Sequence, residues 1–144
     1  MINLSIGDIN SEDYQGYLDL MYEFSNFKKD INYEDLKNYI TKNYNNIRII
    51  TIKNDDENKI VGAGTIFKLE KLHNNPIGQI EDVIITEKYR KLGLGKSIIK
   101  ELFKIGMDEF KCYKIVLNCL NKNISFYEKC NFTISGVQMK YISN

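Results

Sequence analysis

The chain has 144 residues and a net charge of +1, which lacks the basic excess typical of nucleic-acid-binding proteins, so we expect no nucleic-acid partner. No run approaches the ~20 apolar residues of a membrane span, and the N-terminus has no basic segment followed by an apolar one. We therefore expect one cytoplasmic domain over residues 1–144, in which a hydrophobic content of 43% suffices for a single core.

The first half of the chain predicts a strand, two helices and a hairpin. Residues 3–9 alternate apolar and polar side chains, as a short strand does. Ser11, followed by two acids, is a good N-cap for a first helix, and Asn32 can cap a second one. Residues 47–54 are rich in β-branched side chains, and a turn at Asp55–Asn58 connects them to a second strand over 59–69.

The second half predicts alternating strands and helices. A loop at His73–Pro76 precedes a strand at Gly78–Thr86 and a helix at Gly95–Phe110. These are followed by a strand over 114–120, a short helix over Asn123–Phe132 and a last strand over Thr133–Ile142. This order predicts an α/β fold with a mixed, mostly antiparallel sheet. It contains a right-handed parallel strand–helix–strand unit and has helices on both faces.

The cysteines give no sign of a metal site. Cys112, Cys119 and Cys130 have no zinc-ligand spacing, and the chain has one histidine to assist them. We expect no metal and interpret the cysteines as small buried residues of a protein in a reducing compartment.

A glycine-bearing turn between the 78–86 strand and the helix that follows it has the features of a phosphate site. The first amides of a helix lack partners and attract anions, and Gly93 and Gly95 would let the backbone approach a phosphate closely. Arg90, Lys91 and Lys96 add positive charge. The alternative is a turn that merely connects strand to helix.

Three phosphate-binding patterns compete for this turn. The triphosphate loop needs glycine where Arg90 stands, and the dinucleotide fingerprint needs glycine where Ile98 stands. The pattern [QR]-x-x-G-x-[GA] is met in full by residues 90–95.

The segment "YRKLGLGKSIIKEL" resembles the coenzyme A loop of the GCN5-related N-acetyltransferases. Within that superfamily, "IEDV", "CYKI" and "FYEKC" resemble the eukaryotic glucosamine 6-phosphate N-acetyltransferase branch. The close similarity covers roughly residues 78–139. The resemblance implies acetyl-CoA as cosubstrate, an amino sugar phosphate as acceptor and a homodimer with the C-terminal strands near its interface. Taken by itself, the β-prone tail could equally be an ordinary edge strand.

The resemblance also implies site residues. Backbone and side chains of four segments would bind the coenzyme: Val83, Ile84 and Ile85; Arg90, Lys91, Leu92, Gly93, Leu94, Gly95 and Lys96; Tyr113 and Lys114; and Asn123, Phe126, Tyr127 and Lys129. The acceptor would contact Glu81, Asp82, Asn118, His73 and Lys71. Lys28 and Lys29 could reach its phosphate, although a surface basic pair explains them as well.

Acyl transfer to an amine suggests catalytic roles for three of these residues. Glu81 would accept the amine proton, directly or through water, with help from the Asp82 carbonyl, and Tyr127 would protonate the leaving thiolate. An amide near Val83 or Ile84 could stabilise the oxyanion. Each role has a plain alternative, because paired acids are often a solvated strand end and a tyrosine in an amphipathic helix is usually part of the core.

Three departures from the branch lie on the acceptor side. Glu70 stands at the lysine position of its K-x-x-H segment, Asn118 replaces a common acid, and Ile142 falls near a common basic position. Two other functions therefore remain open: acetylation of another small amine or a protein N-terminus, and non-catalytic binding of acyl-CoA.

Overall fold

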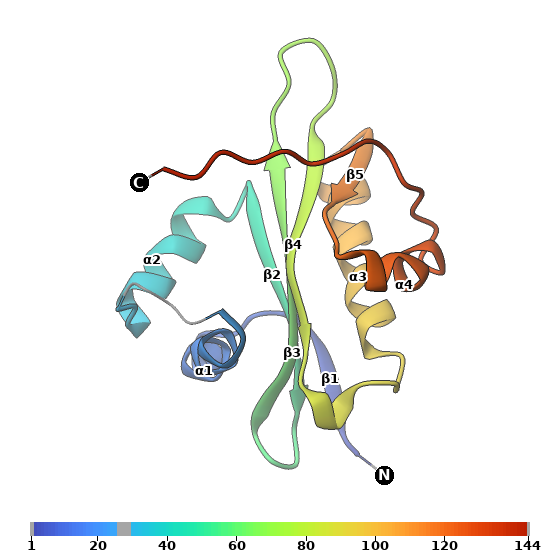
Figure 1. Cartoon of the computed structure of the whole chain (residues 1–144). Coiled ribbons are helices and arrows are strands. Elements are labelled where there is room, and N and C mark those ends of the chain that lie inside the picture. The colour runs from blue at the N-terminus through green and yellow to red at the C-terminus, as the bar shows by residue number, and fades with distance from the viewer. Residues whose placement is uncertain (1, 26–29, 144) are drawn as a thin grey trace.

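A five-stranded sheet in the order β1-β2-β3-β4-β5 organises the chain (Figure 1). The computed structural model describes residues 2–25 and 30–143. The strands are β1 (Leu4–Asp8), β2 (Ile47–Asn54), β3 (Lys59–Leu69), β4 (Ile77–Ile85) and β5 (Lys114–Leu117). The helices are α1 (Tyr14–Ser25), α2 (Tyr33–Asn43), α3 (Leu94–Lys104) and α4 (Ile124–Glu128).

Helices cover both faces of this mixed sheet, which confirms the predicted fold class. Strands β1 to β4 pair antiparallel. Strands β4 and β5, which the chain connects through helix α3, pair parallel. Helices α1 and α2 lie on one face and α3 on the other (Figure 1). Each face has its own apolar cluster, with Leu18 and Ile49 in one and Val61 and Leu102 in the other.

The predicted helix starts differ in outcome. Asn32 caps α2 as expected: its side chain accepts from the Asp35 amide at 2.9 Å, and the Asp35 carboxylate accepts from the Asn32 amide at 3.1 Å. Ser11 was the expected cap of the first helix, and that prediction is wrong. Ser11 opens a short 3₁₀ turn, and α1 begins at Tyr14.

Helix α3 lies close against the sheet because one position of β3 has no side chain. A Cβ at Gly64 would lie 2.6 Å from Ile98 Cγ2, closer than real carbon atoms approach. The predicted helix over 95–110 is confirmed from Leu94 to Lys104 and continues as a π turn to Glu109. Of the helices in the described ranges, none is both long and apolar enough to cross a membrane.

The C-terminal segment, residues 133–143, corrects the prediction of a last strand over Thr133–Ile142. It has no strand pairing and runs across the molecule, over the hairpin of β3 and β4 (Figure 1). Because its path crosses the strands, it cannot hydrogen-bond alongside any of them, and β5 remains the edge of the sheet. Its apolar side chains are exposed, with Val137 at 92% and Met139 at 91%.

Candidate active site

Strands β4 and β5 separate halfway along β4. Their pairing runs from Ile77 opposite Lys114 to Ile80 opposite Leu117, where β5 ends. Strand β4 continues to Ile85, and within the described residues no strand pairs with 81–85 on the β5 side. These peptide groups can therefore accept an extended, amide-bearing ligand as if it were a further strand.

A β-bulge reshapes β4 at the acidic pair. Thr65 pairs with Glu81 and Ala63 pairs with Ile84, so two residues of β4, Asp82 and Val83, share the space opposite one residue of β3. Asp82 has a φ of 55°, in the left-handed region that residues other than glycine seldom adopt. Such backbone strain is common at functional sites.

An open hollow of about 390 Å³ lies beside the bulge. It is lined by residues of β3 and β4: Phe67, Leu69, Gln79, Glu81 and Asp82. The Gln79 amide donates to the Glu81 carboxylate at 3.2 Å. The volume fits a small-molecule ligand, and the two carboxylates would attract a cationic amine.

Two tyrosines that the sequence did not single out lie in the electrostatic environment of Asp82. Burial raises the pKa of the Asp82 carboxyl, and the charge of Asp82 contributes to the raised pKa of Tyr17 and of Tyr39, after burial. Burial raises the pKa of Tyr17 to about 12, although a hydrogen bond with the Thr65 side chain acts in the opposite direction. No local pattern marks Tyr17 and Tyr39, because packing of α1 and α2 on the sheet brings them there.

The glycine turn has the geometry of an anion site. Gly93, at the N-cap of α3, has a φ of 79°, and Lys91 has a φ of 66°. The Ser97 amide donates to the Gly93 carbonyl at 3.2 Å, so the amides of 94–96 precede the first hydrogen bond of the helix. The Arg90 side chain donates to the Ile85 carbonyl at 3.0 Å and ties the turn to the end of β4.

Helix α4 lies next to this turn. A Cβ at Gly95 would lie 3.0 Å from Phe126 Cζ, so glycine permits the close contact. Phe126 meets the Tyr127 ring edge-on at 4.9 Å, and Tyr127 packs against Phe132 at 5.7 Å. Burial raises the pKa of Tyr127, with smaller contributions from the thiols of Cys119 and Cys130.

The structure separates some of the other predicted site residues. Asn123 and Lys129 are the N-cap and C-cap residues of α4, the helix whose Phe126 contacts the glycine turn. Tyr113 and Lys114 stand at the start of β5, opposite Ile77 and thus eight β4 residues, or about 26 Å, from the Ile85 end. The other three predicted acceptor residues are exposed. Asn118 follows β5, and Lys71 and His73 lie in the β3–β4 loop. Lys28 and Lys29 lie outside the described residues.

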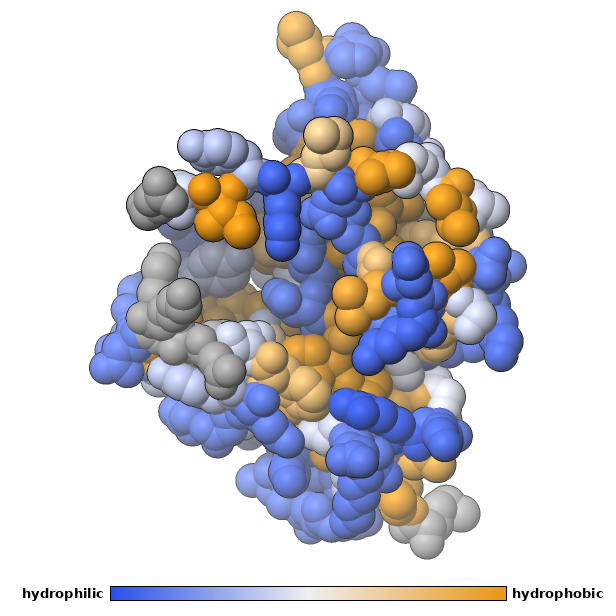
Figure 2. Space-filling view, in the orientation of Figure 1, coloured by the Kyte–Doolittle hydropathy of each residue, from blue (hydrophilic) through white to orange (hydrophobic). Residues whose placement is uncertain are grey.

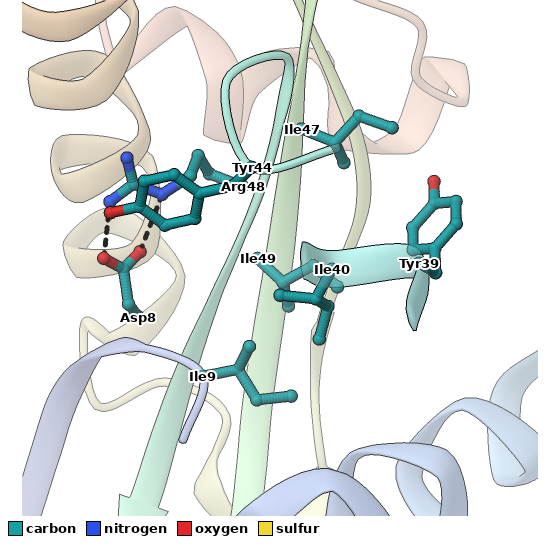
Figure 3. Close-up of a pocket in the computed structure, with 8 residues that line it drawn as sticks. All are labelled: Asp8, Ile9, Tyr39, Ile40, Tyr44, Ile47, Arg48 and Ile49. Carbon is teal, nitrogen blue, oxygen red and sulfur yellow. Dashed lines mark hydrogen bonds and ion pairs between the residues drawn. The ribbon is translucent and has the colours of Figure 1, made fainter. Parts of the chain in front are cut away.

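A second, much smaller pocket lies between β1, β2 and α2, and Tyr39 is among its lining residues (Figure 3). Its volume of about 30 Å³ is that of a single water molecule, too small for a coenzyme or an amine acceptor. Arg48 occupies one side, where it pairs with Asp8 and with Glu109 and lies 4.3 Å from the centre of the Tyr44 ring. We interpret this cluster as structural.

The cysteines are all unpaired thiols. Cys112 and Cys130 are buried as predicted, whereas Cys119, just past β5, is exposed. Within residues 2–25 and 30–143, no three His, Cys, Asp or Glu side chains come together in a group that could hold a metal ion.

Comparison with known proteins matches the model of the acetyltransferase (GNAT) family to residues 8–132. Glucosamine 6-phosphate N-acetyltransferase 1 of Dictyostelium discoideum is 44% identical over 84 residues, which cover 57% of this chain and 53% of that protein. The glucosamine 6-phosphate N-acetyltransferase of Schizosaccharomyces pombe is 32% identical over 94 residues, covering 64% of this chain and 84% of that one. The match thus spans only about half the length of the Dictyostelium relative.

Solved structures agree with these matches. A Trypanosoma brucei acetyltransferase superimposes with a TM-score of 0.88 at 26% identity, over 98% of this chain and 100% of that one. Arabidopsis thaliana glucosamine-6-phosphate N-acetyltransferase also gives 0.88, at 24% identity, over 99% of both chains. With the family model covering most of its length and the fold in agreement, the chain belongs to the acetyltransferase (GNAT) family of acetyl-CoA-dependent acyltransferases.

Proposed function

We propose that the chain transfers the acetyl group of acetyl-CoA to the amine of glucosamine 6-phosphate, giving N-acetylglucosamine 6-phosphate for UDP-N-acetylglucosamine synthesis. One observation supports the reaction type: residues 81–85 of β4, which have no partner on the β5 side, lead from the acid-lined hollow to the glycine turn. The names of the relatives support the acceptor, because the Dictyostelium and fission yeast proteins are both glucosamine 6-phosphate N-acetyltransferases.

The glycine turn and β4 suit a coenzyme A thioester, which supplies the activated acetyl group. The amides of 91–96 and the N-terminal dipole of α3 would hold its diphosphate, aided by the charges of Lys91 and Lys96. The backbone of Val83, Ile84 and Ile85 would pair with the amides of its pantetheine arm. Bound in this way, the coenzyme would bring its thioester near the bulge.

Glu81 and Asp82 would assist the loss of a proton from the acceptor amine. An ammonium group has no lone pair, so the amine must lose a proton before it attacks. The exposed Glu81 carboxylate, at the hollow, accepts that proton directly or through a water. The Asp82 carbonyl, turned by the left-handed φ of 55°, helps to orient the amine.

A backbone amide and Tyr127 would stabilise the negative charge that develops on the thioester during the reaction. An amide near Val83 or Ile84, on the unpaired side of β4, stabilises the oxygen of the thioester carbonyl as it becomes negative. The Tyr127 hydroxyl then donates a hydrogen bond or its proton to the departing thiolate. A phenol is protonated at neutral pH, and because burial raises the Tyr127 pKa further, hydrogen-bond donation is favoured over complete proton transfer.

A second acceptor, a small amine without phosphate, is favoured by one observation. The Glu70 carboxylate, at the position where the branch has lysine, accepts from Lys68 Nζ at 3.0 Å. A carboxylate there repels a phosphate and neutralises the cation beside it.

A thiol-release assay with acetyl-CoA and three acceptors decides between these functions. We expect glucosamine 6-phosphate to exceed glucosamine and spermidine in kcat/KM by at least about ten-fold, the value of one charge-assisted contact. Preference for an unphosphorylated amine would overturn the acceptor and leave the acetyltransferase. Binding of acetyl-CoA without turnover on any amine would instead indicate a non-catalytic acyl-CoA-binding domain.

We also propose that the chain forms a homodimer through the C-terminal segment. Ile134, Val137 and Met139 are 72%, 92% and 91% exposed, and apolar side chains of this segment stand out on the surface in Figure 2. Exposed apolar side chains gathered in one segment are typical of an interface. Light scattering should give twice the monomer mass for the full chain and the monomer mass after deletion of 133–144, and a monomeric full chain would contradict the proposal.

A further inference from the structure

The turn that leads into the glycine loop is fastened to the β2–β3 hairpin by a buried hydrogen bond. The Asn54 side-chain amide, at the end of β2, donates to the Tyr89 hydroxyl at 2.6 Å. Both residues are buried, at 4% and 3% exposure. A buried polar pair of this kind is costly to break, because each group then lacks a partner and is shielded from water.

The other end of the Asn54 side chain is also occupied. Its carbonyl oxygen accepts from the Asp56 amide at 3.0 Å and from the Glu57 amide at 3.2 Å. The hairpin turn therefore fixes the orientation of the carboxamide and aims its NH₂ group at Tyr89. Lys88 and Glu57 form an ion pair at 3.7 Å between the same two segments.

Tyr89 stands where the regular backbone ends and the glycine loop begins. It is the last residue of a 3₁₀ turn whose N-cap, Thr86, donates its amide to the Val61 carbonyl at 2.9 Å. Lys91 and Gly93, just beyond it, both have left-handed φ angles. A loop with such angles follows a path set by its two ends, and those ends are Tyr89 and the start of α3.

We propose that Asn54 and Tyr89 are a positioning pair for the coenzyme diphosphate: their hydrogen bond holds the entry of the glycine loop so that its amides converge on one anion. The inference rests on the proposed function, because the anion is the diphosphate of acetyl-CoA. Neither residue contacts the reacting atoms. The pair acts on binding of donors that carry the diphosphate and leaves the acyl-transfer step unchanged.

Tyr89→Phe tests the proposal, because it removes one hydroxyl and keeps the ring in the core. The measurement is kcat/KM for two donors, acetyl-CoA and S-acetylpantetheine, which has the thioester and pantetheine arm without the diphosphate. We expect the variant to lose about five-fold on acetyl-CoA, the value of roughly one hydrogen bond, and less than about two-fold on S-acetylpantetheine. At saturating acetyl-CoA, kcat should be unchanged.

Matched variants separate positioning from a general loss of stability. Tyr14→Phe removes a hydroxyl from another buried tyrosine, which belongs to the opposite core cluster, and should leave the kinetics with both donors unaffected. Asn54→Ala should reproduce the loss specific to acetyl-CoA. The double variant Asn54→Ala/Tyr89→Phe should be no worse than Asn54→Ala alone, since both changes break the same hydrogen bond.

Two outcomes would overturn the inference in distinguishable ways. Equal losses on both donors, or unchanged acetyl-CoA kinetics in folded Tyr89→Phe and Asn54→Ala, would refute the positioning role and leave the proposed function intact. A wild-type chain that neither binds coenzyme A by calorimetry nor turns over acetyl-CoA would refute the proposed function and the inference with it.

Discussion

Alanine substitution at the two loop glycines should separate the cost of backbone strain from that of side-chain crowding. Gly93 has a φ of 79° and open space where a Cβ would stand, so Gly93→Ala meets no atom and suffers only the left-handed backbone. That conformation costs about 1–2 kcal/mol for a residue with a Cβ. In Gly95→Ala the new Cβ lies 3.0 Å from Phe126 Cζ, and the ring must move by a few tenths of an ångström. Alanine is also favoured over glycine within a helix by about 0.5–1 kcal/mol, which offsets that displacement.

Urea unfolding and calorimetric titration with coenzyme A measure the two effects separately. For Gly93→Ala we expect a loss of about 1–2 kcal/mol in the free energy of unfolding, or roughly 3–6 °C in Tm. Its dissociation constant for coenzyme A should rise at least about ten-fold, because relaxing the φ angle turns the loop amides away from the diphosphate. Gly95→Ala should change the free energy of unfolding by less than about 1 kcal/mol. If Gly93→Ala bound coenzyme A as tightly as the wild type, the loop conformation would not matter for binding and the reasoning would fail.

Two further predictions concern the acidic pair and Tyr127. Glu81→Gln and Tyr127→Phe should each lower kcat at least about ten-fold with little change in coenzyme affinity, as removal of a general base or acid does, and wild-type rates in both would contradict their roles. Asp82→Asn should raise the free energy of unfolding at neutral pH. Burial raises the folded-state pKa of Asp82, so the ionised form disfavours folding at any pH above that pKa. The gain in stability should shrink as the pH falls toward about 3.9, the ordinary pKa of an aspartate. Urea unfolding between pH 3 and pH 8 measures this dependence, and a gain that grew on acidification would contradict the prediction.

Local signals in the sequence account for most of the elements. The Asn32 cap, the hairpin turn at 55–58 and the apolar spacing of α3 each depend on neighbours within a few residues, and all appear where predicted. The Ser11 cap prediction is wrong because an acid that follows it makes a tertiary contact instead. Asp13 is buried and accepts a hydrogen bond from Lys53 Nζ at 2.8 Å. A capping pattern covers only neighbouring residues and cannot predict a contact with a lysine forty residues away.

The site was predictable as a set of motifs but not as a shape. The glycine turn lies between β4 and α3, as its pattern predicts. The bulge at Asp82 depends on the register between β3 and β4, and the electrostatic link between Asp82, Tyr17 and Tyr39 depends on how α1 and α2 pack on the sheet. The 133–143 segment is β-prone, but pairing also requires it to run alongside a strand, and it crosses the strands instead (Figure 1), a path that its own sequence does not specify.

The central claim is that the amides of 91–96 bind the coenzyme diphosphate and direct the thioester along β4 toward Glu81. A crystal structure of the chain with acetyl-CoA tests it most directly. We predict diphosphate oxygens within about 3 Å of these amides and the acetyl carbonyl beside Val83 or Ile84. A diphosphate bound elsewhere, or a thioester remote from Glu81 with the glycine turn empty, would contradict the account.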